Sequence, residues 1–349
     1  SRSYPENGRR IKGSGEISSA ISGDFSSDVN SHARSNWEGN IFVVRGEKIM
    51  GKYIVYQIDS FTKDIFKGNP AGVVYNADGL SQEQMQMIAR ELNNSETAFL
   101  FSSNQNDSDG VIRYFTPKTE VPICGHATIA AMYVKAIEEN LSSSVFRMRT
   151  NIGLLPFEII KTHNDYKIVM TQGKIEFEAP FEGELKERVL KGLDLNENDL
   201  DGRCPIQIVS TGHSKVMIGV KNRERLNKLF PNLMALSELS RIINCNGYFV
   251  FTFDSDSKDI LTYGRMFAPA IGIIEDPVTG NANGPLGAYL VCHNLVDTSK
   301  SEFCFKGKQG EAINRLGTIE VKVKIENDKP VMVQIAGEAV IVFKTEIEV

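Results

Sequence analysis

The amino-acid sequence predicts an α+β fold built from two related halves, and three observations support this prediction. The chain has 349 residues, which is ample for two domains. Two strongly apolar helices are expected to begin at Gly125 and Gly280, each after a strand and a proline turn. The block of sequence that leads into the first helix recurs before the second. We therefore expect an N-terminal half over residues 50–165 and a C-terminal half over residues 166–349.

The recurrence consists of two short segments in the same order. RYFTP at residues 113–117 reappears as RMFAP at residues 265–269, an offset of 152 residues. EVPICGHA at residues 120–127 reappears as EDPVTGNA at residues 275–282, an offset of 155 residues. One short match arises readily by chance, but two in order, each followed by an apolar helix, indicate a duplication.

The elements of the first half follow from local patterns. Ser81 and Gln84 form a capping box at the start of a helix over residues 82–92, whose apolar positions recur at helical spacing. The helix over residues 125–140 is apolar on nearly every face, so protein is expected to surround it. Strands are expected at residues 53–59, 72–75, 97–101 and 111–116.

Residues 1–49 are expected to lie outside the fold. Ten of the first forty residues are serine, and neither helical nor strand periodicity persists there. The codons for residues 45–50 are compatible with a purine-rich ribosome-binding site just before a start codon at Met50. We hypothesise that this segment is a leader or vector-derived sequence, and a native flexible tail is the alternative.

Composition and cysteine usage exclude several classes of protein. Lys and Arg number 39 against 44 Asp and Glu, a net charge of −5 without a basic block, so neither nucleic acid nor a membrane surface is an expected partner. The five cysteines form no CxxC pair, which argues against a disulfide framework or structural zinc and favours the cytoplasm. No metal-ligand cluster, Walker loop or GxGxxG motif is present in the sequence, so we expect neither metal nor cofactor.

The repeated block predicts a site for a small anion. A helix N-terminus offers unpaired backbone N–H groups and about half a positive charge. Gly125 and Gly280 remove side-chain bulk where those groups begin. If the halves face each other, both N-termini point into one cleft and can receive a carboxylate. The alternative is that each glycine only permits a tight turn.

Titratable residues flank this expected cleft. Glu96 precedes an apolar strand, where burial would raise its pKa, and a single carboxyl of this kind suits an intramolecular proton shift. We match its position to residues 209–213 of the second half, which carry no carboxylate. His126 and Asp276 stand at the two helix starts. His126 can hold a substrate carboxylate or relay a proton, whereas Asp276 can anchor a substrate amine or orient His126. The alternatives are a solvated turn carboxylate for Glu96 and helix capping for the other two.

A thiol stands on one side only. Cys124 precedes Gly125, whereas the matching position of the second copy is Thr279, whose hydroxyl is too weak an acid to replace a thiol. This asymmetry argues against a dithiol racemase, which would need a second thiol such as Cys245 or Cys292.

Seven segments together resemble a known family. They are GNPA at 68–71, SETAF at 95–99, FTP at 115–117, VPICGHAT at 121–128, VSTG at 209–212, RMFAP at 265–269 and EDPVTG at 275–280. In this order they are similar to the signature segments of the PhzF-like phenazine-biosynthesis isomerases. The resemblance implies the diaminopimelate epimerase-like fold, in which two pseudosymmetric halves each curl a β barrel around a central helix.

The resemblance also implies functional roles. It implies catalysis without metal or cofactor, Glu96 as general acid/base, and a homodimer. It places His126 and Asp276 in the substrate pocket. We expect Asn69, Ser95, Gly125, Gly280 and Asn281 to bind the substrate as well. Asn281 departs from the serine that the family commonly has there.

The sequence thus predicts a cofactor-independent isomerase that moves a proton within a small carboxylate-bearing substrate. Two alternatives stay open: an amino-acid epimerase that uses Cys124, and a non-catalytic binding protein with an inherited pocket.

Overall fold

The computed structural model describes residues 51–103 and 105–349, so the prediction for residues 1–49 lies outside the described residues. Elements of the first half appear where local patterns predict them. The capping box of Ser81 and Gln84 is formed, and its helix α1 is confirmed. The elements are β1 (Lys52–Ser60), β2 (Asn69–Tyr75), α1 (Gln82–Leu92), β3 (Thr97–Phe101), β4 (Gly110–Phe115), β5 (Glu120–Val121), α2 (Gly125–Glu138), β6 (Ser144–Thr150), β7 (Gly153–Lys161) and β8 (Tyr166–Thr171).

The rest of the chain repeats this order of strands and helices and adds two α-helices, α3 and α4, and two 3-10 helices, which are labelled η. Its strands and helices are β9 (Ile175–Phe177), α3 (Gly183–Gly192), η1 (Glu197–Asp199), β10 (Gln207–Thr211), β11 (Ser214–Gly219), α4 (Arg223–Asn227), α5 (Leu233–Ile243), β12 (Tyr248–Thr252), β13 (Thr262–Ala268), η2 (Pro269–Ile271), β14 (Ile273–Asp276), α6 (Gly280–Cys292), β15 (Glu302–Gln309), β16 (Gly317–Glu326), β17 (Lys329–Gly337) and β18 (Ala339–Glu348).

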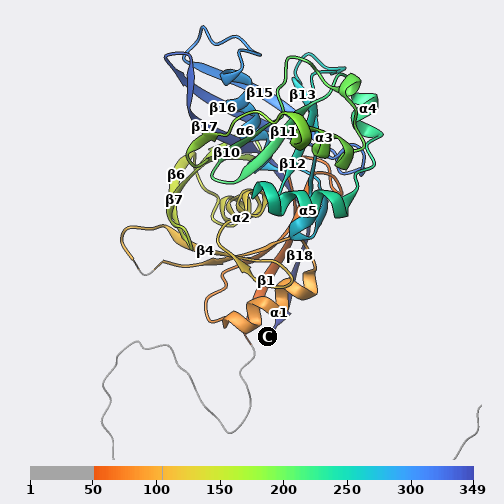
Figure 1. The fold of residues 1–349 in the computed structure, drawn as a ribbon. Helices are drawn as coiled ribbons and strands as arrows, with labels where there is room; N and C mark the ends of the chain where they lie inside the picture. The colour runs from red at the N-terminus through yellow and green to blue at the C-terminus, as the bar shows by residue number, and fades with distance from the viewer. Residues whose placement is uncertain (1–50, 104) are drawn as a thin grey trace, which may run out of the picture. The chain divides into compact units, whose positions relative to one another are not determined.

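Each central helix lies within a curved sheet. Helix α2 packs against β1, β2, β3, β7 and β8, and Figure 1 shows it within the curve of β6 and β7. Helix α6 packs in the same way against β10, β11, β15, β16 and β17. Nearly all of their residues are buried, because apolar side chains occupy every face of both helices. Among the described residues, no helix combines the length and apolar character needed to cross a membrane.

The strands form one continuous sheet, in which two sets of strands have matching orders. β1 lies between β18 and β2, and the parallel pair β2–β3 follows. In the same way β10 lies between β9 and β11, and the parallel pair β11–β12 follows. β8 pairs with β17 and thereby joins the two sets of strands. The division at residue 165 stays a prediction, and in the structure β8 and the C-terminal β18 both pair with strands of the first half.

Strand register identifies the counterparts of individual residues. Thr97 on β3 pairs with Phe115, and Tyr248 on β12 pairs with Phe267, which is the repeat equivalent of Phe115. Glu96 therefore corresponds to Gly247, and the predicted match to residues 209–213 is wrong. The match failed because it followed the order of motifs, whereas register follows backbone pairing. The conclusion drawn from it still holds, since glycine carries no carboxylate.

Candidate active site

Both central helices begin at one pocket of about 230 Å³. Neither α2 nor α6 has a side-chain cap at its N-terminus, so backbone N–H groups of both first turns are available at the pocket wall. The first half contributes Ser95, Glu96, Ile123, Cys124, Gly125 and His126. The second half contributes His213, Ser214, Lys215, Asn244, Asn246, Met266, Ala268, Ile271, Ile273, Asp276, Val278, Thr279, Gly280 and Asn281.

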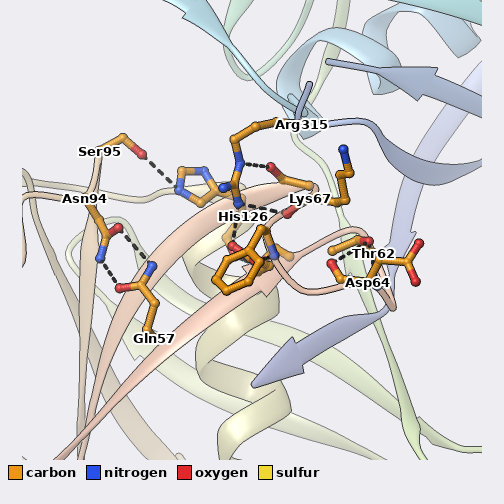
Figure 2. Close-up of polar contacts among 12 residues, drawn as sticks. Gln57, Thr62, Asp64, Lys67, Asn94, Ser95, His126 and Arg315 are labelled. Carbon is orange, nitrogen blue, oxygen red and sulfur yellow. Dashed lines mark hydrogen bonds and ion pairs between the residues drawn. The ribbon is translucent and has the colours of Figure 1, made fainter. Parts of the chain in front are cut away.

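Glu96 reaches the pocket from the loop between α1 and β3. Its backbone carbonyl accepts a hydrogen bond from the N–H of Gly72, which fixes the residue beside β2. The preceding Asn94 and Gln57 on β1 exchange two amide hydrogen bonds of 2.8 and 3.0 Å (Figure 2). This reciprocal pair anchors the loop, so the position of the carboxylate is set by the sheet.

His126 lies at the centre of a polar cluster in the first half. Its Nε2 is 3.4 Å from Oε2 of Glu96 and 3.2 Å from Oγ of Ser95, the contact drawn in Figure 2. Its Nδ1 is 3.4 Å from Sγ of Cys124. Ser60 donates a 2.8 Å hydrogen bond to the His126 carbonyl. The imidazole therefore links the thiol to the carboxylate, and both of its nitrogens have partners.

Asp276 lies at the opposite helix tip with both carboxylate oxygens engaged. Oδ1 accepts a 2.8 Å hydrogen bond from Nδ2 of Asn69, and Oδ2 accepts one from the hydroxyl of Thr279. Burial raises the pKa of Asp276, while the nearby His126 and these hydrogen bonds oppose the rise. Asn69 is itself buried, and its Oδ1 has no partner among the described residues. It is not among the residues that line the pocket, but it donates a hydrogen bond to Asp276, which is.

The two tip glycines differ in their surroundings. A Cβ on Gly125 would meet no atom within 4 Å, so this position opens into the pocket. A Cβ on Gly280 would overlap Cδ1 of Ile335 in the core. Asn281 lines the pocket beside Gln172, whose Nε2 also donates a 2.9 Å hydrogen bond to the Gly280 carbonyl. Gly280 thus serves close packing, while Gly125 leaves room for a guest.

The thiol of Cys124 is poorly suited to act as a base. Burial raises its pKa well above the ordinary range, and the charges of Glu96 and Asp276 raise it further. Its repeat counterpart Thr279 donates to Asp276, so no second thiol stands there. Cys245 and Cys292 do not contribute to the pocket lining in the described part of the chain. The geometry gives the dithiol alternative no second base.

Glu96, Cys124 and His126 also bring three potential metal ligands within 4.8 Å of one another. Their side chains are in polar contact through the imidazole, whose two nitrogens face different partners. A single ion would have to displace one of these contacts. The expectation of no metal and no cofactor stays a prediction.

Sequence reasoning missed the residues that the β10–β11 turn, β11 and the α5–β12 loop bring to the pocket. His213, Lys215, Asn244 and Asn246 all line it. A signal was available in the two asparagines that end α1 and α5. Asn93 and Asn244 both adopt the left-handed conformation, with φ of 52° and 49°. Asn93 lies three residues before Glu96, and Asn244 lies three residues before its counterpart Gly247. That spacing aligns the α5–β12 loop with the loop of Glu96.

Comparisons with known proteins agree with this architecture. The family described as phenazine biosynthesis-like protein matches residues 58–345. An uncharacterized isomerase of Clostridium acetobutylicum is 62% identical over 296 residues, covering 85% of this chain and 98% of the relative. The trans-2,3-dihydro-3-hydroxyanthranilate isomerase of Pseudomonas chlororaphis is 30% identical over 292 residues, covering 83% and 97%. The crystal structure of a PhzF-family phenazine biosynthesis protein of Bacillus anthracis matches with a TM-score of 0.77 at 34% identity, covering 85% and 99%.

The chain therefore belongs to the PhzF family of phenazine biosynthesis-like proteins, as the resemblance predicted. Its fold class is confirmed by the match to the Bacillus anthracis structure. Within the family it is an isomerase.

Proposed function

We propose that this protein moves a proton between two carbons of a small conjugated carboxylate, with Glu96 as the general acid/base and without a cofactor. The observation that carries the proposal is the position of Glu96. Its side chain is 16% exposed, borders the pocket between two uncapped helix tips, and has a single histidine as its ion-pair partner among the described residues.

The steps of the reaction balance on one carboxyl group. The Glu96 carboxylate removes a proton from a substrate carbon, and the electron pair of the broken C–H bond moves into the conjugated system. The resulting Glu96 carboxylic acid returns the proton to a second carbon, which restores the carboxylate. The substrate and product are isomers, so no oxidant, reductant or leaving group is needed.

The neighbours of Glu96 support this role. A proton on Nε2 of His126 would stabilise and orient the carboxylate at 3.4 Å, and Nδ1 is held toward the Cys124 thiol. The backbone N–H groups near Gly125 and Gly280 suit the substrate carboxylate. Asp276 is better suited to positioning than to proton transfer, because both of its oxygens already accept hydrogen bonds.

The proposal is tested by proton NMR in heavy water with a panel of small unsaturated carboxylates. We expect isomer signals or deuterium at a ligand carbon with the wild-type protein and neither with Glu96→Gln. The matched control is Glu91→Gln, an exposed glutamate on α1, which should behave as wild type. If ligands bind without isomerisation or carbon exchange, the non-catalytic alternative is favoured. Equal turnover by Glu96→Gln would contradict the assigned role.

A further inference from the structure

The pocket is chemically asymmetric at the two positions that the internal repeat makes equivalent. Glu96 lies on one side, and its counterpart Gly247 lies on the other. A Cβ on Gly247 would overlap Cδ of Lys215, with the Lys215 Cε at 2.7 Å. The lysine side chain therefore crosses the space in which a side chain of residue 247 would begin. The second half supplies an amine from β11 where the first supplies a carboxylate.

Lys215 is the only lysine or arginine that lines the pocket in the described part of the chain. Its ammonium makes a 3.0 Å hydrogen bond to the carbonyl of the adjacent Ser214. No carboxylate within residues 51–103 and 105–349 comes within the 4.0 Å of an ion pair. By contrast, most lysines that do pair with a carboxylate lie on the surface, where an ion pair contributes little to the free energy of unfolding.

The environment of this amine favours an anionic guest. Burial lowers the pKa of Lys215, and electrostatic attraction to the Cys245 thiol group and the Asp276 carboxylate partly offsets that effect. The nearby His213 also has a lowered pKa, through burial and the charge of Lys215. A desolvated cation without a protein counter-ion is costly, and a bound anion would offset this cost.

We propose that Lys215 binds a second anionic group of the substrate, so that this protein acts on a molecule with two acidic groups. The first group lies at the helix tips and the second lies against β11 and the α5–β12 loop, where Asn244 and Asn246 are further polar contacts. This inference rests on the proposed function and names the substrate class of the same site. A carboxylate and a phosphate-type group share the required chemistry.

Three probes of similar length test the proposal: butyrate, succinate and 3-phosphonopropionate. Dissociation constants are measured by ligand-observed NMR at pH 7 and low salt. We expect the wild-type protein to bind at least one dianion about tenfold or more tightly than butyrate, because a charge-assisted hydrogen bond is gained. Preference for succinate identifies a carboxylate site, and preference for 3-phosphonopropionate identifies a phosphate-type site.

Two variants locate the preference. Lys215→Met should bind all three probes with nearly equal affinity, whereas Lys215→Arg should retain part of the preference. Gly247→Ala keeps the charge but displaces the lysine side chain, so it should weaken the preference and provides a second measurement if Lys215→Met folds poorly. Lys174→Met, at an exposed site outside the pocket, is the control.

The proposal is overturned if wild-type protein binds butyrate as tightly as both dianions, or if Lys215→Met keeps the preference. These measurements need no turnover, so they are repeated with Glu96→Gln. If the wild-type protein isomerises a substrate but shows no preference for a dianion, only the role of Lys215 is contradicted. A retained preference without isomerisation by the wild-type protein contradicts the proposed reaction alone.

Discussion

Nε2 of His126 lies 3.4 Å from Oε2 of Glu96, and the two side chains are only 8% and 16% exposed. Because the protein around them excludes most water, an electrostatic interaction between the two side chains is stronger than it would be on the surface. The pair connects the N-terminus of α2 to the loop before β3, two elements that the sequence separates by almost thirty residues. Its geometry leads to the first prediction.

Replacing Glu96 by glutamine should leave the fold intact and remove nearly all turnover. The amide has the shape of the carboxyl group but cannot take a proton from carbon, and general acid/base catalysis contributes about a hundred- to ten-thousand-fold. Circular dichroism and thermal unfolding check the fold, and NMR-detected isomerisation checks the rate. Retention of more than about a tenth of the activity would exclude Glu96 as the base.

Replacing Cys124 by serine should reduce turnover by no more than about threefold. The buried thiol has a raised pKa and is protonated at neutral pH, so its contribution is the contact with Nδ1 of His126, which a hydroxyl can reproduce. Steady-state rates of Cys124→Ser and of wild type decide the matter. The epimerase alternative predicts the opposite result, namely that Cys124→Ser is inactive. It also predicts that a thiol-alkylating reagent inactivates the wild-type protein and that bound substrate protects against this inactivation.

The parts of the fold that depend on local chemistry were predictable from the sequence. Ser81 and Gln84 lie within one helical turn, so their capping box is visible in the sequence and α1 has the predicted bounds. The repeat likewise brought Gly125 and Gly280 to one pocket, because related halves place equivalent helix starts in equivalent positions.

The parts that depend on strand register were not predictable in this way. The counterpart of Glu96 is fixed by the pairing of β3 with β4 and of β12 with β13, which motif order does not reveal. Lys215 was missed for a related reason. A lysine at the start of a strand is ordinarily solvated, and only its packing over Gly247 directs it to the pocket.

The two tip glycines should respond differently to alanine. Gly280→Ala should destabilise the protein by about 1–3 kcal/mol, because its Cβ would overlap the buried Ile335. Gly125→Ala should keep the wild-type stability and weaken ligand binding, because its Cβ would project into open pocket space. Urea unfolding and NMR titration with succinate test both effects. Equal stability losses would show that the tips have equivalent surroundings.

The repeated Arg–Glu pairs should also differ, according to their burial. Arg265 and Glu275 are 8% and 7% exposed, and Arg265 additionally donates to the carbonyls of Leu226, Asn227 and Leu229. Arg265→Met would leave a buried carboxylate unpaired and should cost about 3–5 kcal/mol. The equivalent substitution Arg113→Met, in a more exposed pair, should cost about 1 kcal/mol. Urea unfolding of both variants makes the comparison, and equal losses would refute it.

The pair of Arg113 and Glu120 should make stability depend on acid pH. Hydrogen bonds from Arg113 hold the pKa of Glu120 below its usual value of 4.5, and Asn151 adds a further hydrogen bond, while burial opposes both. A folded-state pKa below the unfolded value means that the carboxylate stabilises the fold fully above about pH 4.5 and loses this contribution as pH falls through the lower, folded value. Glu120→Gln should therefore be less stable than wild type by about 1 kcal/mol at pH 7, and the difference should shrink steadily below pH 4.5. Urea unfolding from pH 7 to pH 3 measures this difference directly. A constant difference over that range would show that the loss comes from packing, because only the ionised carboxylate titrates away.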